Sequence, residues 1–228
     1  LLRAFAWHNP IIGYCQGLNR LAAIALLVLN EEDAFWCLVL IVDFLMPKTY
    51  YSKTLMASQV DQRVLKDLLA MKCPRLATHL DAHGIDIGLI TFNWFLTIFV
   101  DNVPFETVLL VWDSFLYEGC KVLFRFALAV FRLNEESLLQ IDDTSLIFQQ
   151  MREMAANISD NRSLSQTAFP GLNPFPMRVI NKQRAHHTAI VKEELAEMES
   201  LRNTHQESTF ESQRNDPAMI VFSDDDDM

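Results

Sequence analysis

A glutamine flanked by two glycines is the residue pattern in this chain that most clearly suggests chemistry. The pentapeptide GYCQG occupies residues 13–17, inside the stretch HNPIIGYCQGLNRLAAIALLVLN (residues 8–30). Glycines let a backbone approach another surface closely, and a helix that begins here offers free N–H donors. A neutral amide both donates and accepts hydrogen bonds. Gln16 therefore has the chemistry to orient a water molecule against a phosphate, although a glutamine that caps a buried helix fits the same residues.

Other reactive residue types form weaker patterns. Cys15 with His8 is conceivable as a nucleophile and base, but nearness in sequence does not establish geometry. His79 and His83 lie four residues apart, so they share a helix face, yet a metal site needs a third and a fourth ligand with defined spacing. We therefore expect no metal site. No phosphate-binding Gly-x-x-x-x-Gly-Lys-Ser/Thr and no Gly-x-Gly-x-x-Gly is present, so we expect no nucleotide cofactor.

Charge is distributed unevenly along the 228 residues. The formal net charge is −10, and residues 193–228 hold eleven acidic and two basic residues, which leaves residues 1–192 nearly neutral. No basic cluster is large enough to neutralise a row of phosphates, so we expect no nucleic-acid partner. The longest apolar stretches are shorter than the roughly 18 residues of a membrane span, so we expect no membrane insertion. Four cysteines without a C-x-x-C pair indicate buried free thiols in a reducing compartment.

The elements that must position these residues follow from hydrophobic periodicity and from proline and glycine. The pattern has no strand-type alternation and indicates an all-α domain of at least seven helices. Expected helices cover residues 10–30, 34–46, 55–72, a short stretch through Leu80, 89–100, 104–117, 121–133 and a last one capped by Asp142-Asp143 through about residue 156. Residues 160–178 contain FPGLNPFPMR and read as a wrapping loop or linker. Residues 182–202 form one amphipathic helix, and the polar chain from 204 onward is expected to be disordered.

Two motifs in order resemble one known family. GYCQGLN resembles the glutamine-finger motif of TBC domains, which are the catalytic domains of Rab GTPase-activating proteins. FNWFLTIFVDNVPFETVLLVWDSFLYEG (92–119) resembles the later signature of that family, and LFRFALAVF (123–131) resembles the helix that follows. The resemblance implies a multi-helix TBC-type fold with a partial TBC domain at 1–180. The rest of the chain is expected to form a C-terminal amphipathic helix at 181–203 and a disordered acidic tail at 204–228.

The resemblance also implies a role for each matching residue. Gln16 matches the glutamine finger, which positions the attacking water in place of the GTPase's own glutamine. Gly13, Tyr14 and Gly17 match the residues that shape its loop. The structural signature, which we expect to hold helices rather than do chemistry, is matched by Trp94, Trp112 and Asp113.

The second catalytic group of the family has no match in this sequence. Its arginine finger belongs to an Ile-x-x-Asp-x-x-Arg motif upstream of the glutamine, and neither Arg3 nor Arg20 fits that motif. Because the chain begins at Leu1 within the helical-looking LLRAF, we expect a fragment whose N-terminal part is missing. Arginine fingers contribute on the order of 10³–10⁵ in rate. We therefore expect this chain alone to be weak or inactive.

The function implied by the resemblance is activation of Rab GTPases in trans, as a regulator rather than a self-contained enzyme. The partner is a GTP-loaded Rab, which carries the GTP and Mg²⁺, so the chain needs no cofactor. The alternative is a non-catalytic module that docks on a Rab, and a further reading makes the 182–202 helix and its tail a separate partner-binding appendage. The chain looks most like the subgroup with N-terminal pleckstrin-homology and coiled-coil regions. That subgroup implies a cytoplasmic protein, peripheral to endosomal or other vesicle membranes through its partner or through the missing N-terminal regions.

Overall fold

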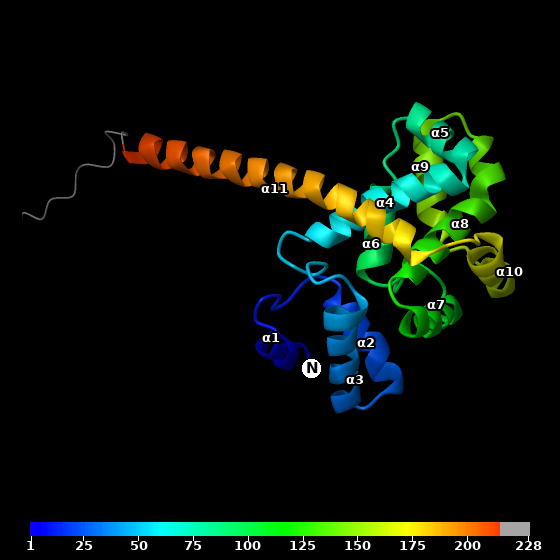
Figure 1. Cartoon of the computed structure of the whole chain (residues 1–228), viewed down its shortest axis with the longest axis horizontal. Helices are drawn as coiled ribbons and strands as arrows, with labels where there is room; N and C mark the ends of the chain where they lie inside the picture. Colours follow the sequence, from blue (N-terminus) through cyan, green and yellow to red (C-terminus); the bar gives the residue numbers. More distant parts are fainter. Residues whose placement is uncertain (215–228) are drawn as a thin grey trace, which may run out of the picture. The chain divides into compact units, whose positions relative to one another are not determined.

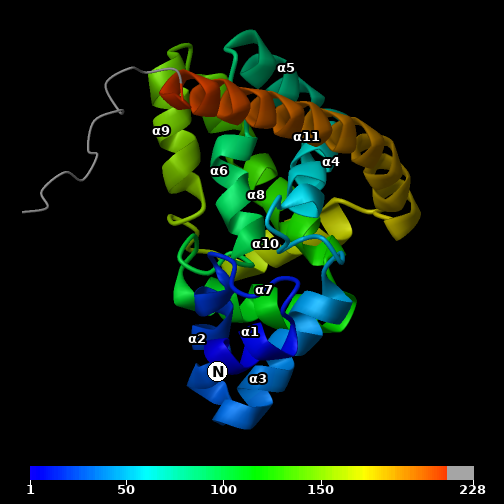
Figure 2. The ribbon, with the colours of Figure 1, turned by 90° about the vertical axis from the view of Figure 1, so that its left-hand side faces the viewer.

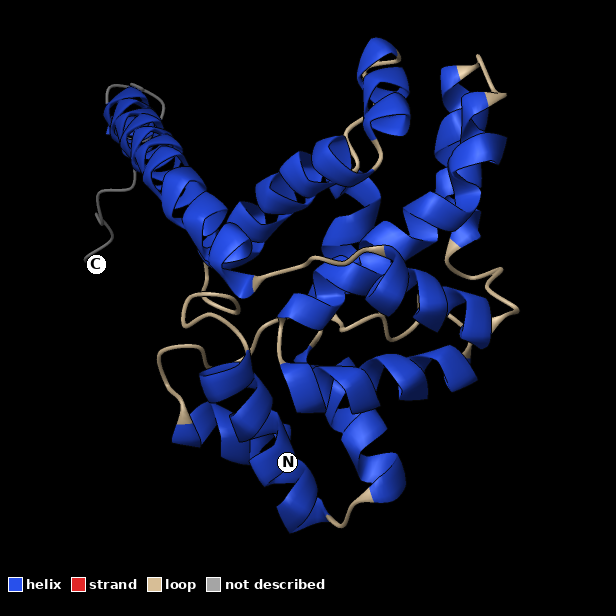
Figure 3. Ribbon diagram, turned by 45° about the vertical axis from the view of Figure 1, so that its right-hand side comes forward, coloured by secondary structure: helices blue, strands red, loops and turns tan. Residues whose placement is uncertain are grey.

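The computed structural model describes the backbone of residues 1–214 and the side chains of residues 1–202. Within these residues every regular element is a helix, which confirms the expected all-α class (Figure 3). The α-helices are α1 (Leu2–His8), α2 (Leu18–Val28), α3 (Glu31–Leu40), α4 (Met56–Lys72), α5 (Pro74–Ala82), α6 (Gly88–Leu96), α7 (Phe105–Glu118), α8 (Lys121–Leu139), α9 (Thr144–Met154), α10 (Asn161–Gln166) and α11 (Met177–Arg214), and two π-helical segments, η1 (Ile41–Leu45) and η2 (Thr167–Gly171), continue α3 and α10 (Figure 1).

The chain divides into two compact units, Leu1–Ala189 and Ile190–Met228. Helix α11 begins in the first unit and continues into the second. It starts at Met177, earlier than the predicted residue 182, and its backbone is helical to Arg214, which includes the first residues of the predicted disordered tail. The remainder of that tail, residues 215–228, lies outside the described residues.

Helix α8 forms the centre of the first unit. Its ten consecutive residues from Val122 to Phe131 are all buried, and nine of the ten are apolar. Helices α4, α5, α6, α7, α9 and α10 each pack against it (Figure 2). The predicted end at residue 133 was too early, since α8 continues to Leu139.

The proline-rich segment 160–178 is mostly helical, so its prediction as a loop was wrong. The Asp160 carboxylate accepts a hydrogen bond from the Ser163 N–H (3.0 Å) and starts α10, which runs into η2. Arg125, a buried cation on α8, donates to the carbonyl oxygen of Ala168 (2.9 Å) and lies 5.0 Å from the centre of the Phe175 ring. These contacts hold the segment, which was expected to be a wrapping loop or linker, against the core.

Two predicted helices are shorter than expected, each for its own local reason. The helix expected over 10–30 begins only at Leu18, because Gly13 and Gly17 adopt positive φ (63° and 103°) and break the right-handed path. The helix expected over 89–100 ends at Leu96, where the Thr97 hydroxyl bonds to backbone carbonyls and a turn follows. Both shortened ends face the pocket described below.

Several local signals were read correctly. Helix α4 covers nearly the whole stretch predicted for it, and Pro74 opens α5 as its first residue. The Asp143 side chain caps α9 by accepting from the Leu146 N–H (2.9 Å). Helix α3 is capped by Asn30, whose side chain accepts from the Asp33 N–H (3.0 Å). Capping residues therefore located helix starts better than periodicity located helix ends.

The first turns of α11 are tied to α4 by ionisable side chains. Arg184 donates from Nε and Nη2 to the two carboxylate oxygens of Asp61, both at 2.7 Å, and lies 3.4 Å from the Cys120 sulfur. His187 lies 2.7 Å from the carboxylate of Asp67, which is also on α4. Burial raises the pKa of Asp61, while the carboxylate holds the pKa of Arg184 above its usual range.

Candidate functional site

The loop between α1 and α2 carries the glutamine identified in the sequence. Gly17, at the N-cap of α2, has φ of 103°, and a Cβ atom placed on it would lie 3.4 Å from the Leu96 side chain and 3.5 Å from the Leu96 carbonyl oxygen. Gly13 has φ of 63° in open surroundings. Both positions therefore favour glycine through backbone conformation, and Gly17 also through its close approach to α6.

Gln16 projects from this loop with its amide uncommitted. The residue is exposed, and within residues 1–202 its side chain makes no hydrogen bond. Helix α2 has no side-chain cap, so the reading of Gln16 as a capping residue is not supported. Its neighbour Tyr14 is 59% exposed. An amide with free donor and acceptor atoms is thus presented to solvent beside an exposed aromatic ring.

The amide borders a pocket of about 470 Å³ between two parts of the chain. One wall is the glutamine loop and the start of α2, and the other is the end of α6 with the turn that follows it. The lining residues are Tyr14, Gln16, Gly17, Asn19, Arg20, Asn93, Leu96, Thr97 and Asp101. Most of these side chains are polar, so the pocket suits a hydrated or charged ligand surface better than an apolar one.

An ion pair crosses the pocket. Arg20 Nε lies 2.8 Å from a carboxylate oxygen of Asp101, and the two side chains are 54% and 49% exposed. Asn93 donates to the Asn102 side chain (3.0 Å), and Asn102 in turn donates to the Val100 carbonyl oxygen (2.8 Å). The turn wall of the pocket is therefore ordered by its own polar side chains.

This turn also stores backbone strain. Ile98, Phe99 and Asp101 all have positive φ, between 51° and 68°, a region that β-branched and bulky residues rarely adopt. Such residues persist only where the surroundings hold them, and they concentrate at functional sites. The strain therefore supports a functional role for this wall of the pocket.

Of the three residues predicted to be structural, Trp94 and Trp112 contact the strained turn and Asp113 does not. Trp112 donates its indole N–H to the Ile98 carbonyl oxygen (3.2 Å), and the ring of Trp94 packs against Phe99 at 5.6 Å between centroids. Both tryptophans are buried. Asp113 differs, because it is exposed on α7. The tryptophans thus brace the strained turn, and through it the pocket.

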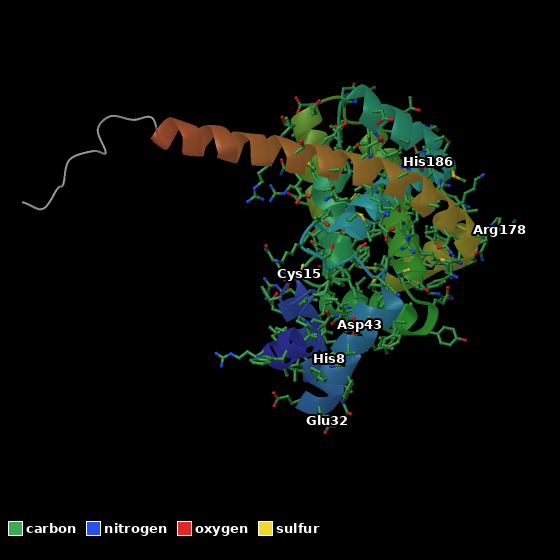
Figure 4. The ribbon with its side chains drawn as sticks, turned by 60° about the vertical axis from the view of Figure 1, so that its left-hand side comes forward. His8, Cys15, Glu32, Asp43, Arg178 and His186 are labelled. Atoms are coloured by element: carbon green, nitrogen blue, oxygen red, sulfur yellow. The ribbon has the colours of Figure 1, made fainter. Side chains whose placement is uncertain are left out.

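In the described part of the chain, Cys15 and His8 contact other groups, and no cluster of side chains is arranged for a metal ion. Cys15 donates from Sγ to the Gln16 carbonyl oxygen (3.4 Å), and burial raises the pKa of its thiol. His8 instead packs edge-on against Phe35 and Trp36, and Figure 4 shows its place on the ribbon. No group of three or more His, Cys, Asp or Glu side chains fit for a metal ion occurs in these residues.

The histidine pair on α5 contacts backbone instead. His79 Nε2 lies 3.0 Å from the Ile141 carbonyl oxygen, and both ring nitrogens of His83 lie within 3.1 Å of carbonyl oxygens, those of His79 and Asp142. These nitrogens secure the connection between α8 and α9. The spacing of the two histidines therefore serves contacts with backbone carbonyl oxygens.

Comparison with known proteins agrees with this architecture. A family model described as the Rab-GTPase-TBC domain matches residues 1–139, so the chain belongs to the Rab-GTPase-TBC domain family. The crystal structure of the Chlamydomonas flagellar RabGAP TBC domain is similar with a TM-score of 0.67 and 36% identity, over 74% of this chain and 57% of that one. The resemblance found in the two motifs is confirmed.

The similar curated proteins are much longer than this chain. TBC1 domain family member 2A of Mus musculus is 57% identical over 203 residues, which are 89% of this chain and 22% of that protein. TBC1 domain family member 2B of Homo sapiens is 54% identical over 202 residues, or 89% and 21%. The chain thus spans about a fifth of the length of these relatives. None of its described helices is both long and apolar enough to cross a membrane.

Proposed function

We propose that this chain belongs to a GTPase-activating protein for Rab-family small GTPases, and that Gln16 is its glutamine finger. Membership of the Rab-GTPase-TBC domain family supports the reaction class. The observation that carries the residue assignment is the exposed Gln16 amide, free of hydrogen bonds within residues 1–202, at the edge of a polar pocket. A glutamine finger has to reach a docked GTPase, and an exposed amide with no partner among the described residues keeps its donor and acceptor atoms available for that contact.

The proposed chemistry uses both polar groups of the Gln16 side-chain amide, the carbonyl oxygen and the N–H₂. A GTP-loaded Rab docks over the pocket and brings its own GTP and Mg²⁺, so this chain contributes no cofactor. The side-chain carbonyl oxygen of Gln16 accepts a hydrogen bond from the attacking water. The side-chain N–H₂ donates toward oxygens of the transferred phosphoryl group. Because these bonds are made in the transition state, they raise the rate of hydrolysis rather than the affinity alone.

The chain alone supplies one of the two groups that this mechanism uses. The 228 residues contain no Ile-x-x-Asp-x-x-Arg motif, and Arg20 is engaged with Asp101. We propose that full activation requires an arginine outside this sequence and that this chain by itself is weak or inactive. The same absence favours a second candidate function, a module that binds a GTP-loaded Rab without accelerating hydrolysis.

The test is single-turnover phosphate release from a panel of GTP-loaded Rabs. The chain is compared with a longer polypeptide that includes an upstream arginine motif, each as parent and as Gln16→Ala. In the longer form, Gln16→Ala lowers kcat/KM on the order of 10²–10³-fold, as loss of one transition-state hydrogen bond does. Gln149→Ala, at a glutamine on α9, is the matched control and leaves the rate unchanged. If Gln16→Ala and Gln149→Ala behave alike while Rab binding persists, the non-catalytic module is the better description.

We further propose that the protein works in the cytoplasm, peripheral to endosomal or other vesicle membranes, and reaches them through its Rab partner or through regions outside this sequence. The near-neutral charge of residues 1–192 supports an indirect attachment, because direct binding to anionic lipid uses clustered basic residues. Imaging the tagged chain in cells with and without the activated Rab tests this proposal.

A further inference from the structure

Asn9 makes a hydrogen bond with every polar group it has. Its backbone N–H donates to the Phe5 carbonyl oxygen (2.8 Å) and ends α1, and its carbonyl oxygen accepts from the Gly13 N–H (2.8 Å). Its side-chain oxygen accepts from the Ile12 N–H (3.2 Å), and its side-chain nitrogen donates to the Asp43 carboxylate (2.8 Å). One residue thus joins the end of α1, the first turn of the glutamine loop and a distant carboxylate.

The carboxylate comes from a distorted part of the fold. Asp43 lies in the π-helical segment η1, in which the Met46 N–H bonds to the Ile41 carbonyl oxygen, five residues earlier (3.0 Å). Ile41 and Val42 beside it are buried, so the core fixes this turn. Insertion of a π turn redirects the side chains that follow, and such turns occur often at functional sites. Figure 4 shows Asp43 at a level between His8, the last residue of α1, and Cys15, within the loop.

The loop itself offers little else to order it. Between Pro10 and Gln16 only Ile12 is buried, and Gly13 in the middle of the loop and Gly17 at its end have the positive φ angles described above. A segment with few buried apolar contacts opens at low free energy unless polar contacts restrain it. The Asn9 side chain and Asp43 supply that restraint at the base of the loop, while Gln16 at its far end stays free.

We propose that Asn9 and Asp43 are positioning residues for the Gln16 amide: their hydrogen bond holds the glutamine loop in the conformation that presents the amide to a docked GTPase. This inference rests on the proposed function of Gln16. A catalytic group must be held within about 0.5 Å of its productive geometry, and a displacement of about 1 Å costs on the order of 10²-fold in rate. Asn9 and Asp43 affect kcat by positioning Gln16, and neither of them contacts a reacting atom.

The test is an exchange of the two side chains. Asn9→Asp places two carboxylates against each other and removes the donor to Asp43. The double variant Asn9→Asp/Asp43→Asn restores the bond in the opposite sense, because the amide introduced at position 43 donates to the carboxylate introduced at position 9, which still accepts from the Ile12 N–H. In the longer polypeptide used above, Asn9→Asp lowers kcat about 10²-fold with KM changed less than about 3-fold, and the double variant returns kcat to within about 3-fold of the parent.

A readout independent of catalysis is amide hydrogen exchange in the 228-residue chain. Asn9→Asp raises the exchange rates of the Ile12 and Gly13 amides about tenfold, while amides of α8 keep their protection, and the double variant restores both loop amides. Equal exchange in parent and Asn9→Asp overturns the proposal, as does a double variant that folds but fails to recover. If exchange responds as expected while Gln16→Ala has no effect on hydrolysis, the loop restraint stands and the proposed function of Gln16 fails.

Discussion

Two arginine–aspartate pairs in this molecule have the same chemistry and opposite surroundings. Arg184 binds Asp61 through two hydrogen bonds, with side chains 15% and 1% exposed, and joins α11 to α4. Arg20 meets Asp101 through one short contact, with both side chains about half exposed, across the candidate pocket. The comparison teaches that burial, more than the identity of the partners, sets what an ion pair does: the first fixes the fold, and the second can open at little cost.

Removal of the buried carboxylate is expected to have the largest effect. Asp61→Ala leaves the Arg184 guanidinium among apolar neighbours without its partner, so the free energy of unfolding falls by about 3–5 kcal/mol. Chemical denaturation followed by circular dichroism measures this change. Asp81→Ala, which breaks the exposed contact of Asp81 with Lys66 (2.9 Å), is the matched control and changes stability by less than about 1 kcal/mol. Equal losses in both variants would contradict the distinction between buried and exposed pairs.

Replacement of both buried partners is expected to have an intermediate effect. In the double variant Asp61→Leu/Arg184→Met no charge is left unpaired, so its free energy of unfolding stays within about 1–2 kcal/mol of the parent and above that of Asp61→Ala. The same denaturation experiment on the single and double variants gives their coupling energy. A double variant as unstable as Asp61→Ala would mean that the pair contributes through its specific hydrogen bonds.

Removal of the exposed pair is expected to have the smallest effect. Asp101→Asn removes the charge but keeps a residue type that tolerates the left-handed conformation at this position, so the free energy of unfolding changes by about 0–1 kcal/mol at low salt, and the difference disappears near 1 M NaCl, where the Debye length is about 3 Å. Thermal unfolding of parent and variant across a salt series measures it. A loss of several kcal/mol that persists at high salt would show that this pair holds the strained turn.

Local signals in the sequence predicted much of the fold. The apolar periodicity of α4, the proline that opens α5 and the aspartate that caps α9 act through neighbouring residues, and all three were read correctly. The glutamine motif was found in the same way, because its residues are adjacent. Helix ends were missed where side chains replace backbone hydrogen bonds, as Thr97 does at the end of α6.

The rest of the site depends on contacts between distant parts of the chain. Asn9 and Asp43 are 34 residues apart, and no spacing rule links them. The left-handed conformations of Ile98 and Phe99 contradict the preferences of these residue types, so no local rule predicts them. Arg20 was considered only as a failed match to the arginine motif, whereas its contact with Asp101 is visible only in three dimensions.

The buried pair also has a consequence for synthesis on the ribosome. Asp61 and Arg184 are separated by 123 residues of chain. At roughly 5–20 residues per second, Asp61 is made about 6–25 s before the guanidinium that neutralises it. During that interval α4 cannot reach its final burial without enclosing a lone carboxylate. We therefore expect the nascent helices to stay incompletely packed until the start of α11 has been translated.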